Sequence, residues 1–541
     1  MASPDVSTTS SAAPDVSAQQ QTAPPSTTVT RVDAALLAAL VAASALLRMS
    51  LLDTWYWADE GQSIGIASHR LFDIPGLLRR DGSPPLYYLL LHGWMAVAGR
   101  SETATHILSL VFALAIVPVA FWGGRTFFGA RAGWCCAVLT ACNPFLTYYG
   151  QETRMYSLVA LLSLLATTCF VHAFALGHRR YVLPFGIALA LLLYTHNWGL
   201  LVALAFLAAT AGCAFWTGDR HRAWTDAFVA FGATALLYLP WLPTLLQQAA
   251  HTGAPWSPAP TISQALTDLI HLVGDKWAAA VVVLVGGAGV IKAAAGRAVT
   301  PDRRIVLIVA LVTAIPIATA FGVSRASPVW TARYLAVAVA PLFLLAGMGL
   351  ARMGKVGVVG LAVVVLLSPQ GVSRVNGSSN TGTAFRSNVK LVMAHLPKLG
   401  RGDIVVSVQP DEVPLLSFYG PADARFATPL GLTANPSVFD WRDALHKLRS
   451  SRSTAVLQPL VQALAPGRHL VLVVPTAVVM RSDLPWFTLM RERAQTFRRE
   501  LVSDRLLRLE GVFPGGRHDP IGSSAHALVF RRTNIGRTDH S

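Results

Sequence analysis

Charged residues are scarce in this chain. Only 13% of its 541 residues are Asp, Glu, Lys or Arg, whereas 53% are hydrophobic. An ordinary soluble domain carries about 25% charged residues, so a water-soluble protein is excluded for most of this length. Long apolar runs point the same way, because each approaches the roughly 20 residues that cross a bilayer as a helix. They lie at 32–52, 155–176, 197–216, 227–242 and 305–323.

Cysteines are also few, and none has the CxxC or Cys/His spacing of a metal site. All five lie within apolar segments: Cys135, Cys136, Cys142, Cys169 and Cys213. We interpret them as small buried hydrophobic residues. A secretory signal is missing as well. Residues 1–31 are rich in Ser, Thr, Pro and Gln and lack an apolar core, which predicts a disordered cytoplasmic tail.

Positive charge exceeds negative charge by 16, yet we exclude a nucleic-acid partner. Many of the basic residues lie in short loops between apolar segments, and cytoplasmic loops of membrane proteins carry this excess. Five basic clusters therefore predict the cytoplasmic side, together with a cytoplasmic N-terminus. They are Arg125 with Arg131, residues 178–180, residues 220–222, Arg297 with Arg303 and Arg304, and Arg352 with Lys355.

The segment 84–98 decides how the first outer loop is threaded. If both 84–98 and 104–122 crossed the bilayer, every later basic cluster would face outward. The segment 84–98 is short, opens with two prolines and contains His92 and Trp94, so we predict a juxtamembrane helix there. Eleven spanning helices then follow, at 32–52, 104–122, 133–148, 155–176, 181–195, 197–216, 225–242, 277–292, 305–323, 334–351 and 356–368.

After Pro369 the pattern changes from long apolar runs to short ones. Strand-like stretches at 403–408, 469–474 and 527–530 alternate with helix-like stretches at 388–396 and 484–501. This region is long enough for its own core. We therefore predict three parts: the tail over 1–31, a helical membrane domain over 32–369 with outer loops at 53–103 and 243–276, and an extracytoplasmic α/β domain over 370–541.

Carboxylates gather in the first predicted outer loop. Asp59 and Glu60 follow helix one among three aromatic residues, and Asp81 precedes two prolines. Adjacent carboxylates at a membrane boundary are costly unless they are paired or used. A helix cap explains each of them equally well, because Asp at the cap and Glu in the first turn stabilise a helix N-terminus.

Arginines come to the same predicted face from other loops. Arg154 follows Glu152 at a helix junction, and Arg333 precedes Tyr334 at the outer end of another helix. A loop salt bridge between Glu152 and Arg154 is the alternative interpretation of that pair, and snorkelling is the alternative for Arg333. For His196 the alternative is a structural role. Taken together, carboxylates and arginines from four loops predict a pocket with a base and anion clamps, because Arg binds phosphate through a planar fork.

These motifs, in order, resemble those of bacterial GT-C glycosyltransferases, and among them the protein-O-mannosyltransferase and aminoarabinose-transferase-like superfamily. The resemblance covers about 50–370, and the C-terminal part resembles the extracytoplasmic α/β domains of some members. The motifs are Asp59-Glu60, the Asp81 to Tyr88 stretch, the turn at 99–102, the stretch from Gln151 to Tyr156, Tyr194-Thr195-His196, residues 240–243 and Arg333-Tyr334.

The resemblance implies transfer of a sugar from a polyprenyl-phosphate carrier to a glycan, lipoglycan or protein acceptor outside a bacterial plasma membrane. Asp59 matches the catalytic base and Glu60 a residue that orients it. The residues expected to contact the phosphate, sugar or lipid are Asp81, Tyr87, Tyr88, Glu152, Arg154, His196, Arg333 and Tyr334. In some members a divalent metal ion is held at this site, and Asp81 and His251 match its ligands.

Three positions depart from the family pattern. Ser83 stands where many members have His or Lys, Gln62 where aminoarabinose transferases have a basic residue, and His106 where an Arg is common. Gln62 argues against aminoarabinose as the sugar, so mannose is favoured and arabinofuranose is second. A transporter or flippase of lipid-linked or amphiphilic substrates is the alternative, and a non-catalytic assembly or sensor protein is a third.

Overall fold

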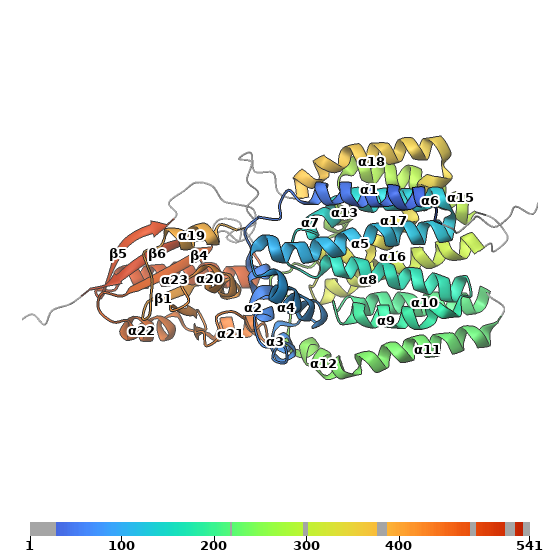
Figure 1. Cartoon of the computed structure of the whole chain (residues 1–541). Helices are drawn as coiled ribbons and strands as arrows, with labels where there is room; N and C mark the ends of the chain where they lie inside the picture. Colours follow the sequence, from blue (N-terminus) through green and yellow to red (C-terminus); the bar gives the residue numbers. More distant parts are fainter. Residues whose placement is uncertain are drawn as a thin grey trace, which may run out of the picture.

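The computed structural model describes residues 29–216, 219–295, 301–375, 387–475, 483–513 and 525–533. Most of the predicted tail, and Arg297 of one basic cluster, lie outside these residues. Figure 1 shows two parts end to end: a body of long, roughly parallel helices and a smaller part built on a sheet. The predicted fold class, a helical membrane protein with a C-terminal α/β domain, is confirmed.

Each of the eleven predicted spans contains helix. In the described residues seven helices are long and apolar enough to cross a membrane by themselves, so the count of eleven stays a prediction. The helices of the body are α1 (Arg31–Arg48), α5 (Glu102–Phe128), α6 (Ala130–Cys142), α7 (Pro144–Tyr149), α8 (Tyr156–Phe170), α9 (Val182–Leu193), α10 (Gly199–Trp216), α11 (Arg220–Tyr238), α14 (Lys276–Val281), α15 (Gly287–Ala294), α16 (Pro301–Ala326), α17 (Ala336–Arg352) and α18 (Gly354–Val375).

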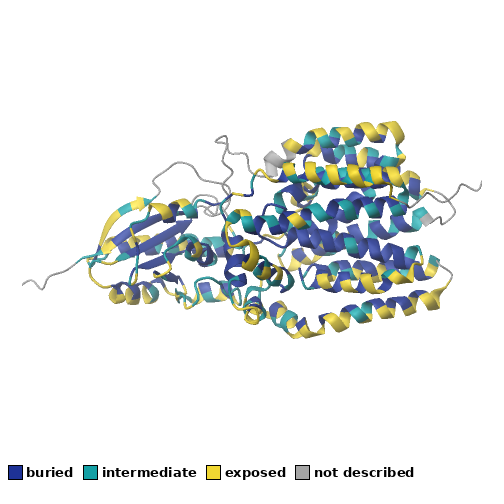
Figure 2. Cartoon of the chain, in the orientation of Figure 1, coloured by how far each residue is buried: buried dark blue, intermediate teal, exposed yellow. Residues whose placement is uncertain are grey.

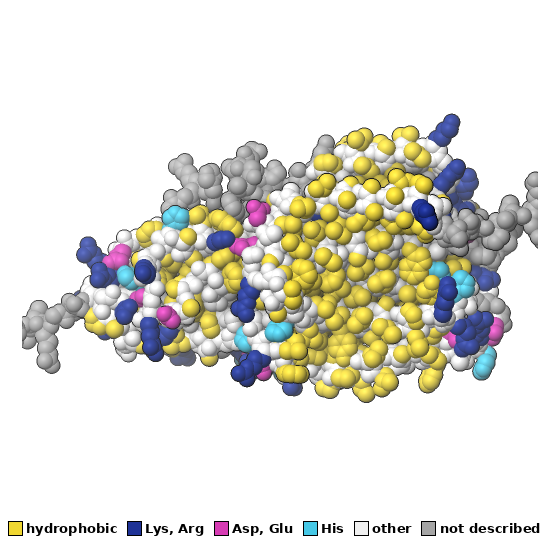
Figure 3. All heavy atoms as spheres, viewed as in Figure 1, with side chains coloured by type: hydrophobic (Ala, Val, Ile, Leu, Met, Phe, Trp, Pro, Cys, Tyr) yellow, Lys and Arg dark blue, Asp and Glu magenta, His cyan; other side chains and the backbone are white. Residues whose placement is uncertain are grey.

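Burial separates the inner helices from those that face outward. The spans that contain α8 and α17 are 89% and 83% buried, whereas the span that begins with α11 is 22% buried. Figure 2 shows the same order, with the exposed residues on the outer helices. The outward surface is covered by hydrophobic side chains (Figure 3). A surface of this kind is stable in lipid, which agrees with the scarcity of charge.

The basic clusters lie at the end of the body that is far from the sheet (Figure 3). Ion pairs hold several of them there. Arg125 pairs with Asp33 at 3.4 Å, and Arg179 pairs with Asp226 at 2.7 Å. The loops that carry the predicted site residues lie at the opposite end. This arrangement is what the charge pattern predicts, and the assignment of that opposite end to the outer face stays a prediction.

Short helices cover the end of the body next to the sheet. They are α2 (Ala58–Ala67), α3 (Ile74–Asp81), α4 (Leu86–Ala98), α12 (Leu242–His251) and α13 (Ile262–Val273). Helix α4 remains at this end. Its Leu86 N–H donates to Tyr194 O beyond the last turn of α9, and Trp94 Nε1 donates to Ala104 O in the first turn of α5. The segment 84–98 thus forms a short helix at this end of the body, and its juxtamembrane position stays a prediction.

The C-terminal part is a six-stranded mixed sheet in the order β3-β2-β1-β4-β6-β5. The central strand β1 is parallel to β2 and β4, and the remaining pairs are antiparallel. Its strands are β1 (Ile404–Ser407), β2 (Arg425–Thr428), β3 (Gly431–Leu432), β4 (His469–Pro475), β5 (Leu507–Phe513) and β6 (Ala525–Arg532). Its helices are α19 (Val389–His395), α20 (Val413–Tyr419), α21 (Ala444–Ser450), α22 (Ser453–Ala463) and α23 (Pro485–Ser503).

Helix α2 packs directly against this C-terminal domain through two glycines one helical turn apart. A Cβ atom at Gly61 would lie 2.7 Å from Leu415 Cα, and one at Gly65 would lie 1.8 Å from Ser437 O. Between them, Gln62 exchanges two hydrogen bonds with the backbone of Phe439, at 3.0 and 2.9 Å. The helix that carries Asp59 is therefore held by the backbone of the C-terminal domain.

Adding a methyl group at Gly65 is expected to break this contact. The variant Gly65→Ala should lose about 1–3 kcal/mol of stability through overpacking, seen as a lower Tm of the full-length protein in detergent. Gly76→Ala is the matched control, because Gly76 lies in neighbouring α3 with no atom near its missing Cβ. There the better helix propensity of Ala should leave Tm unchanged or raise it. Equal effects at the two positions would contradict tight packing at Gly65.

Candidate functional site

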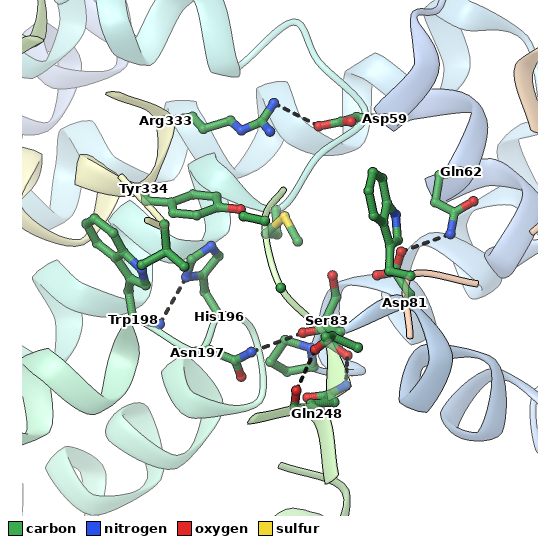
Figure 4. Close-up of a pocket in the computed structure, with 18 of the residues that line it drawn as sticks. Asp59, Gln62, Asp81, Ser83, His196, Asn197, Trp198, Gln248, Arg333 and Tyr334 are labelled. Atoms are coloured by element: carbon green, nitrogen blue, oxygen red, sulfur yellow. Dashed lines mark hydrogen bonds and ion pairs between the residues drawn. The ribbon is translucent and has the colours of Figure 1, made fainter. Parts of the chain in front are cut away.

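A cavity of about 480 Å³ lies where α2, α3 and α12 meet the ends of the body helices and the C-terminal domain. This volume is within the range of small-molecule sites. Six of the predicted residues line it from five segments: Asp59, Asp81, Arg154, His196, and the adjacent Arg333 and Tyr334. Loops that are far apart in the sequence thus come together as the charge parity predicts. Figure 4 shows the side chains of five of them, all but Arg154, around a common space.

Asp59 and two arginines form the charged side of the cavity. Arg333 Nη1 lies 2.8 Å from Asp59 Oδ2, and Arg154 Nη2 lies 3.8 Å from the same oxygen (the first contact is drawn in Figure 4). Arg154 also donates to Asp59 O and to Ser63 Oγ, at 3.2 and 3.0 Å. Two guanidinium groups therefore converge on one carboxylate, which leaves positive charge for an anionic ligand.

Aromatic rings hold the second arginine in place. The Arg333 guanidinium lies over the rings of Trp256, Trp57 and Tyr334, at 4.8, 5.5 and 5.8 Å. Cation–π contacts of this kind keep a guanidinium group oriented while its N–H groups stay available to an anion. Trp256 belongs to the long outer loop, so three separate segments determine where Arg333 points.

Glu60 lies next to Asp59 in the chain but has different surroundings. Its side chain is fully buried and does not line the cavity. Its Oε1 accepts hydrogen bonds from His106 Nε2 and from the Thr153 N–H, each at 2.7 Å. It also accepts from the Trp57 N–H at 3.3 Å, which caps the start of α2. Glu60 therefore holds the first turn of α2, the turn that carries Asp59.

His106 explains one departure from the family pattern. Its Nδ1 lies 2.8 Å from Leu52 O while its Nε2 contacts Glu60. His106 thus joins Leu52 to Glu60 at a position where the resemblance leads us to expect Arg.

Three other predicted contacts lie outside the cavity. Glu152 is buried and accepts a hydrogen bond from Trp57 Nε1 at 2.7 Å. Tyr87 and Tyr88 are fully buried in the core, where Tyr87 OH contacts Ser109 Oγ at 3.3 Å. These three residues do not line the cavity, and their contact with substrate stays a prediction.

Asp81 lines the cavity opposite the arginines. Its Oδ1 accepts a hydrogen bond from Gln62 Nε2 at 2.9 Å (Figure 4). Burial raises the pKa of this carboxyl, and the hydrogen bonds from Ser83 and Gln62 oppose that rise. Gln62 thus connects Asp81 to the backbone of the C-terminal domain. In aminoarabinose transferases the residue at this position is basic.

The predicted metal ligands do not form a metal site in this arrangement. His251 Nδ1 lies 3.3 Å from Asp443 Oδ2 and borders a separate pocket, whereas Asp81 faces the main cavity. Among the described residues, His, Cys, Asp and Glu side chains nowhere gather in threes as metal ligands. The donor set thus does not fit a divalent ion, and we assign no step to one.

His196 and Tyr334 form the wall next to the body helices. The Tyr334 ring lies edge-on to His196 with centroids 4.7 Å apart, and His196 Nδ1 accepts the Trp198 N–H at 3.1 Å (Figure 4). Burial, together with Arg154 and Arg333, lowers the pKa of His196 to about 3. The ring is therefore neutral at physiological pH and carries its proton on Nε2.

Several lining residues carried no signal in the sequence. Asn197 Nδ2 donates to Gly82 O at 3.0 Å, and Gln248 Nε2 donates to Leu78 O at 2.9 Å. These amides join α9, α12 and the end of α3 around the cavity. Asp411 reaches it from the C-terminal domain. Asn197 adjoins the motif at 194–196, whereas Gln248 and Asp411 lie in segments with no motif and are identifiable only once the fold brings them to the cavity.

Asp411 and Glu412 belong to a short 3₁₀ turn, Pro410–Glu412, that follows β1. Burial raises the pKa of Asp411 to about 6, and the Asp59 charge adds to that rise. Burial and the neighbouring Asp411 raise the pKa of Glu412 to about 8. Only Asp411 lines the cavity.

No family model and no curated protein sequence matches this chain. Solved structures match it by fold. ArnT from Cupriavidus metallidurans in the apo state aligns with a TM-score of 0.57 at 12% identity, over 92% of this chain and 98% of that one. ArnT bound to undecaprenyl phosphate also aligns with a TM-score of 0.57 at 12% identity, over 93% of this chain and 98% of that one. An oligosaccharyltransferase from Archaeoglobus fulgidus, in complex with Zn and sulfate, aligns with a TM-score of 0.50 at 14% identity, over 80% of this chain and 67% of that one.

These structures are GT-C glycosyltransferases, and the chain therefore has the GT-C fold. The likeness to ArnT extends through both parts of the molecule, since nearly the whole length of each chain is aligned. The resemblance seen in the motifs is thus confirmed at the level of the fold.

The raised pKa of Glu412 predicts a pH-dependent stability. Its folded pKa of about 8 exceeds the ordinary 4.5, so the fold favours the protonated form and wild-type stability falls as pH rises from about 4.5 to about 8. The cost reaches at most about 1.4 kcal/mol per pH unit. Glu412→Gln should remove it, so the Tm advantage of the variant should widen between pH 5 and pH 8. An advantage that stays constant with pH would contradict the assignment.

Proposed function

We propose that this protein transfers a sugar from a polyprenyl-phosphate carrier to an acceptor at the outer face of a bacterial plasma membrane. The observation that carries the proposal is the convergence of Arg154 and Arg333 on Asp59 in a cavity at one end of the membrane helices. Mannose is the favoured sugar and arabinofuranose the second. The acceptor class is a glycan, a lipoglycan or a protein of the cell envelope.

In this proposal Asp59 is the general base. It accepts the proton of an acceptor hydroxyl while that oxygen attacks the anomeric carbon of the sugar. The bond from the anomeric carbon to the phosphate oxygen breaks, and the electron pair leaves with the polyprenyl phosphate. One displacement of this kind inverts the configuration at the anomeric carbon. Glu60 acts at a distance, because its bonds to His106 and Thr153 hold the first turn of α2.

Arg154 and Arg333 are proposed to hold the phosphate. The donor is a phosphodiester with one negative charge, and departure of the sugar adds a second charge to the phosphate. Guanidinium groups already in place stabilise that developing charge without rearranging. Arg333 is paired with Asp59 at 2.8 Å, so a bound phosphate would compete for Arg333 and release the carboxylate for proton transfer.

The lining of the cavity supports a lipid-linked donor. Leu200, Leu245, Val323 and Val329 line it next to the polar residues. These apolar side chains come from the ends of α10, α12 and α16 and from the loop that follows α16. A polyprenyl chain lying among the body helices would therefore bring its phosphate to the arginines from the membrane side.

A transporter or flippase is the alternative. Transporters place substrate and coupling-ion sites near the midplane of the bilayer, at broken helices. Here the charged residues of the cavity lie at one end of the body, beside the C-terminal domain (Figure 1). This location favours transfer at the membrane surface over passage through the membrane.

Replacing the proposed base is the direct test. Asp59→Asn should lower product formation by about 10²–10⁴-fold, which is the usual contribution of a general base, with expression and Tm unchanged. The measurement is mass spectrometry of the envelope glycans in a deletion strain complemented with each variant. Asp73→Asn is the matched control, because Asp73 is an exposed carboxylate of the same outer loop. If Asp59→Asn forms as much product as wild type, the assignment of Asp59 as the base is contradicted.

A further inference from the structure

Asp411 is the one acidic side chain that the C-terminal domain contributes to the cavity lining, within the described residues. It follows the central strand β1, whose buried residues fix the position of the turn, and the turn packs against α2. The glycine contacts of α2 hold the two domains together here, so the position of Asp411 relative to Asp59 is set by backbone packing.

One oxygen of the Asp411 carboxylate has a hydrogen-bond partner among the described residues, and the other does not. Its Oδ2 accepts a hydrogen bond from Gln409 Nε2 at 3.1 Å, which holds the side chain in one orientation. Its Oδ1 is buried and has no hydrogen-bond partner in the described part of the chain. A buried carboxylate oxygen without a donor costs free energy, and a ligand that brings a donor removes that cost.

The chemistry of the cavity indicates which part of a ligand meets Asp411. A phosphate is an acceptor and an anion, so it is repelled by this carboxylate and attracted to Arg154 and Arg333. The polyprenyl chain is apolar and fits the membrane side. A sugar ring carries several hydroxyl donors, and the indole of Trp441, from the same domain, lines the cavity as well. The Asp411 carboxylate can accept hydrogen bonds from sugar hydroxyls, and the Trp441 indole can pack against the apolar face of the same sugar ring.

We propose that Asp411 binds a hydroxyl group of the sugar carried by the donor, so that the C-terminal domain helps to select which sugar is transferred. This inference rests on the proposed function, because it names a contact within the same site. Asp411 then belongs to substrate recognition, while Asp59 and the arginines act on the proton and the phosphate.

Lipid binding to the full-length protein in nanodiscs tests the contact without chemistry. The probes are undecaprenyl phosphate, undecaprenyl-phosphate mannose and undecaprenyl-phosphate arabinofuranose. Wild type is expected to bind one of the two sugar lipids more tightly than undecaprenyl phosphate. Asp411→Ala should lower the affinity for that sugar lipid at least tenfold and change the affinity for undecaprenyl phosphate less than twofold. Asp411→Asn, which keeps the size of the side chain, should show a smaller loss of the same kind.

Glu412→Gln is the matched control, because Glu412 is the neighbouring carboxyl of the same turn but does not line the cavity. It should leave all three affinities within twofold of wild type. Parallel loss of all three lipids in Asp411→Ala, or no loss, would overturn the contact, as would a wild-type protein that binds undecaprenyl phosphate but prefers neither sugar lipid. A wild-type protein that binds none of the three would instead overturn the proposed function.

Discussion

The contact between α2 and the C-terminal domain holds the site together. At Gly61 and Gly65 the helix meets the backbone of that domain with no space for a side chain, and Gln62 hydrogen-bonds to Phe439 between them. On its other side Glu60 ties the first turn of α2 to His106 and Thr153. Asp59 projects from a helix that is held from both sides, so its distance to Arg333 does not depend on a mobile loop.

Charge is distributed unevenly over the molecule. The face of the body seen in Figure 3 is covered by apolar side chains, and the basic clusters of its loops lie at the end far from the sheet. Within the cavity, positive charge lies on the Asp59 side, whereas burial raises the pKa of Asp81 and Asp411. In the proposed function this asymmetry draws the phosphate toward Arg154 and Arg333 and leaves the Asp411 side to the sugar.

Much of the fold was predictable, because lipid imposes a strong constraint on sequence. Scarce charge and long apolar runs predict the helical body, and loop charge predicts that Asp59, Arg154 and Arg333 share one face. The parity argument also placed 84–98 at that face. The sequence does not predict which of two adjacent residues faces the cavity. Asp59 lines it and Glu60 is buried, and this depends on the orientation of α2, which is set by backbone far away in the sequence. Asp411 lies some 350 residues from Asp59 in the chain, in a segment that carries none of the family motifs.

The position of the lipid phosphate tests the central claim most directly. A structure of the full-length protein with undecaprenyl phosphate, determined by cryo-electron microscopy in a nanodisc, would show it. The account predicts a phosphate within hydrogen-bond distance of both Arg154 and Arg333, the polyprenyl chain leaving past Leu200 and Val323, and the Asp59–Arg333 pair opened. A phosphate bound elsewhere, with that pair intact, would contradict the account.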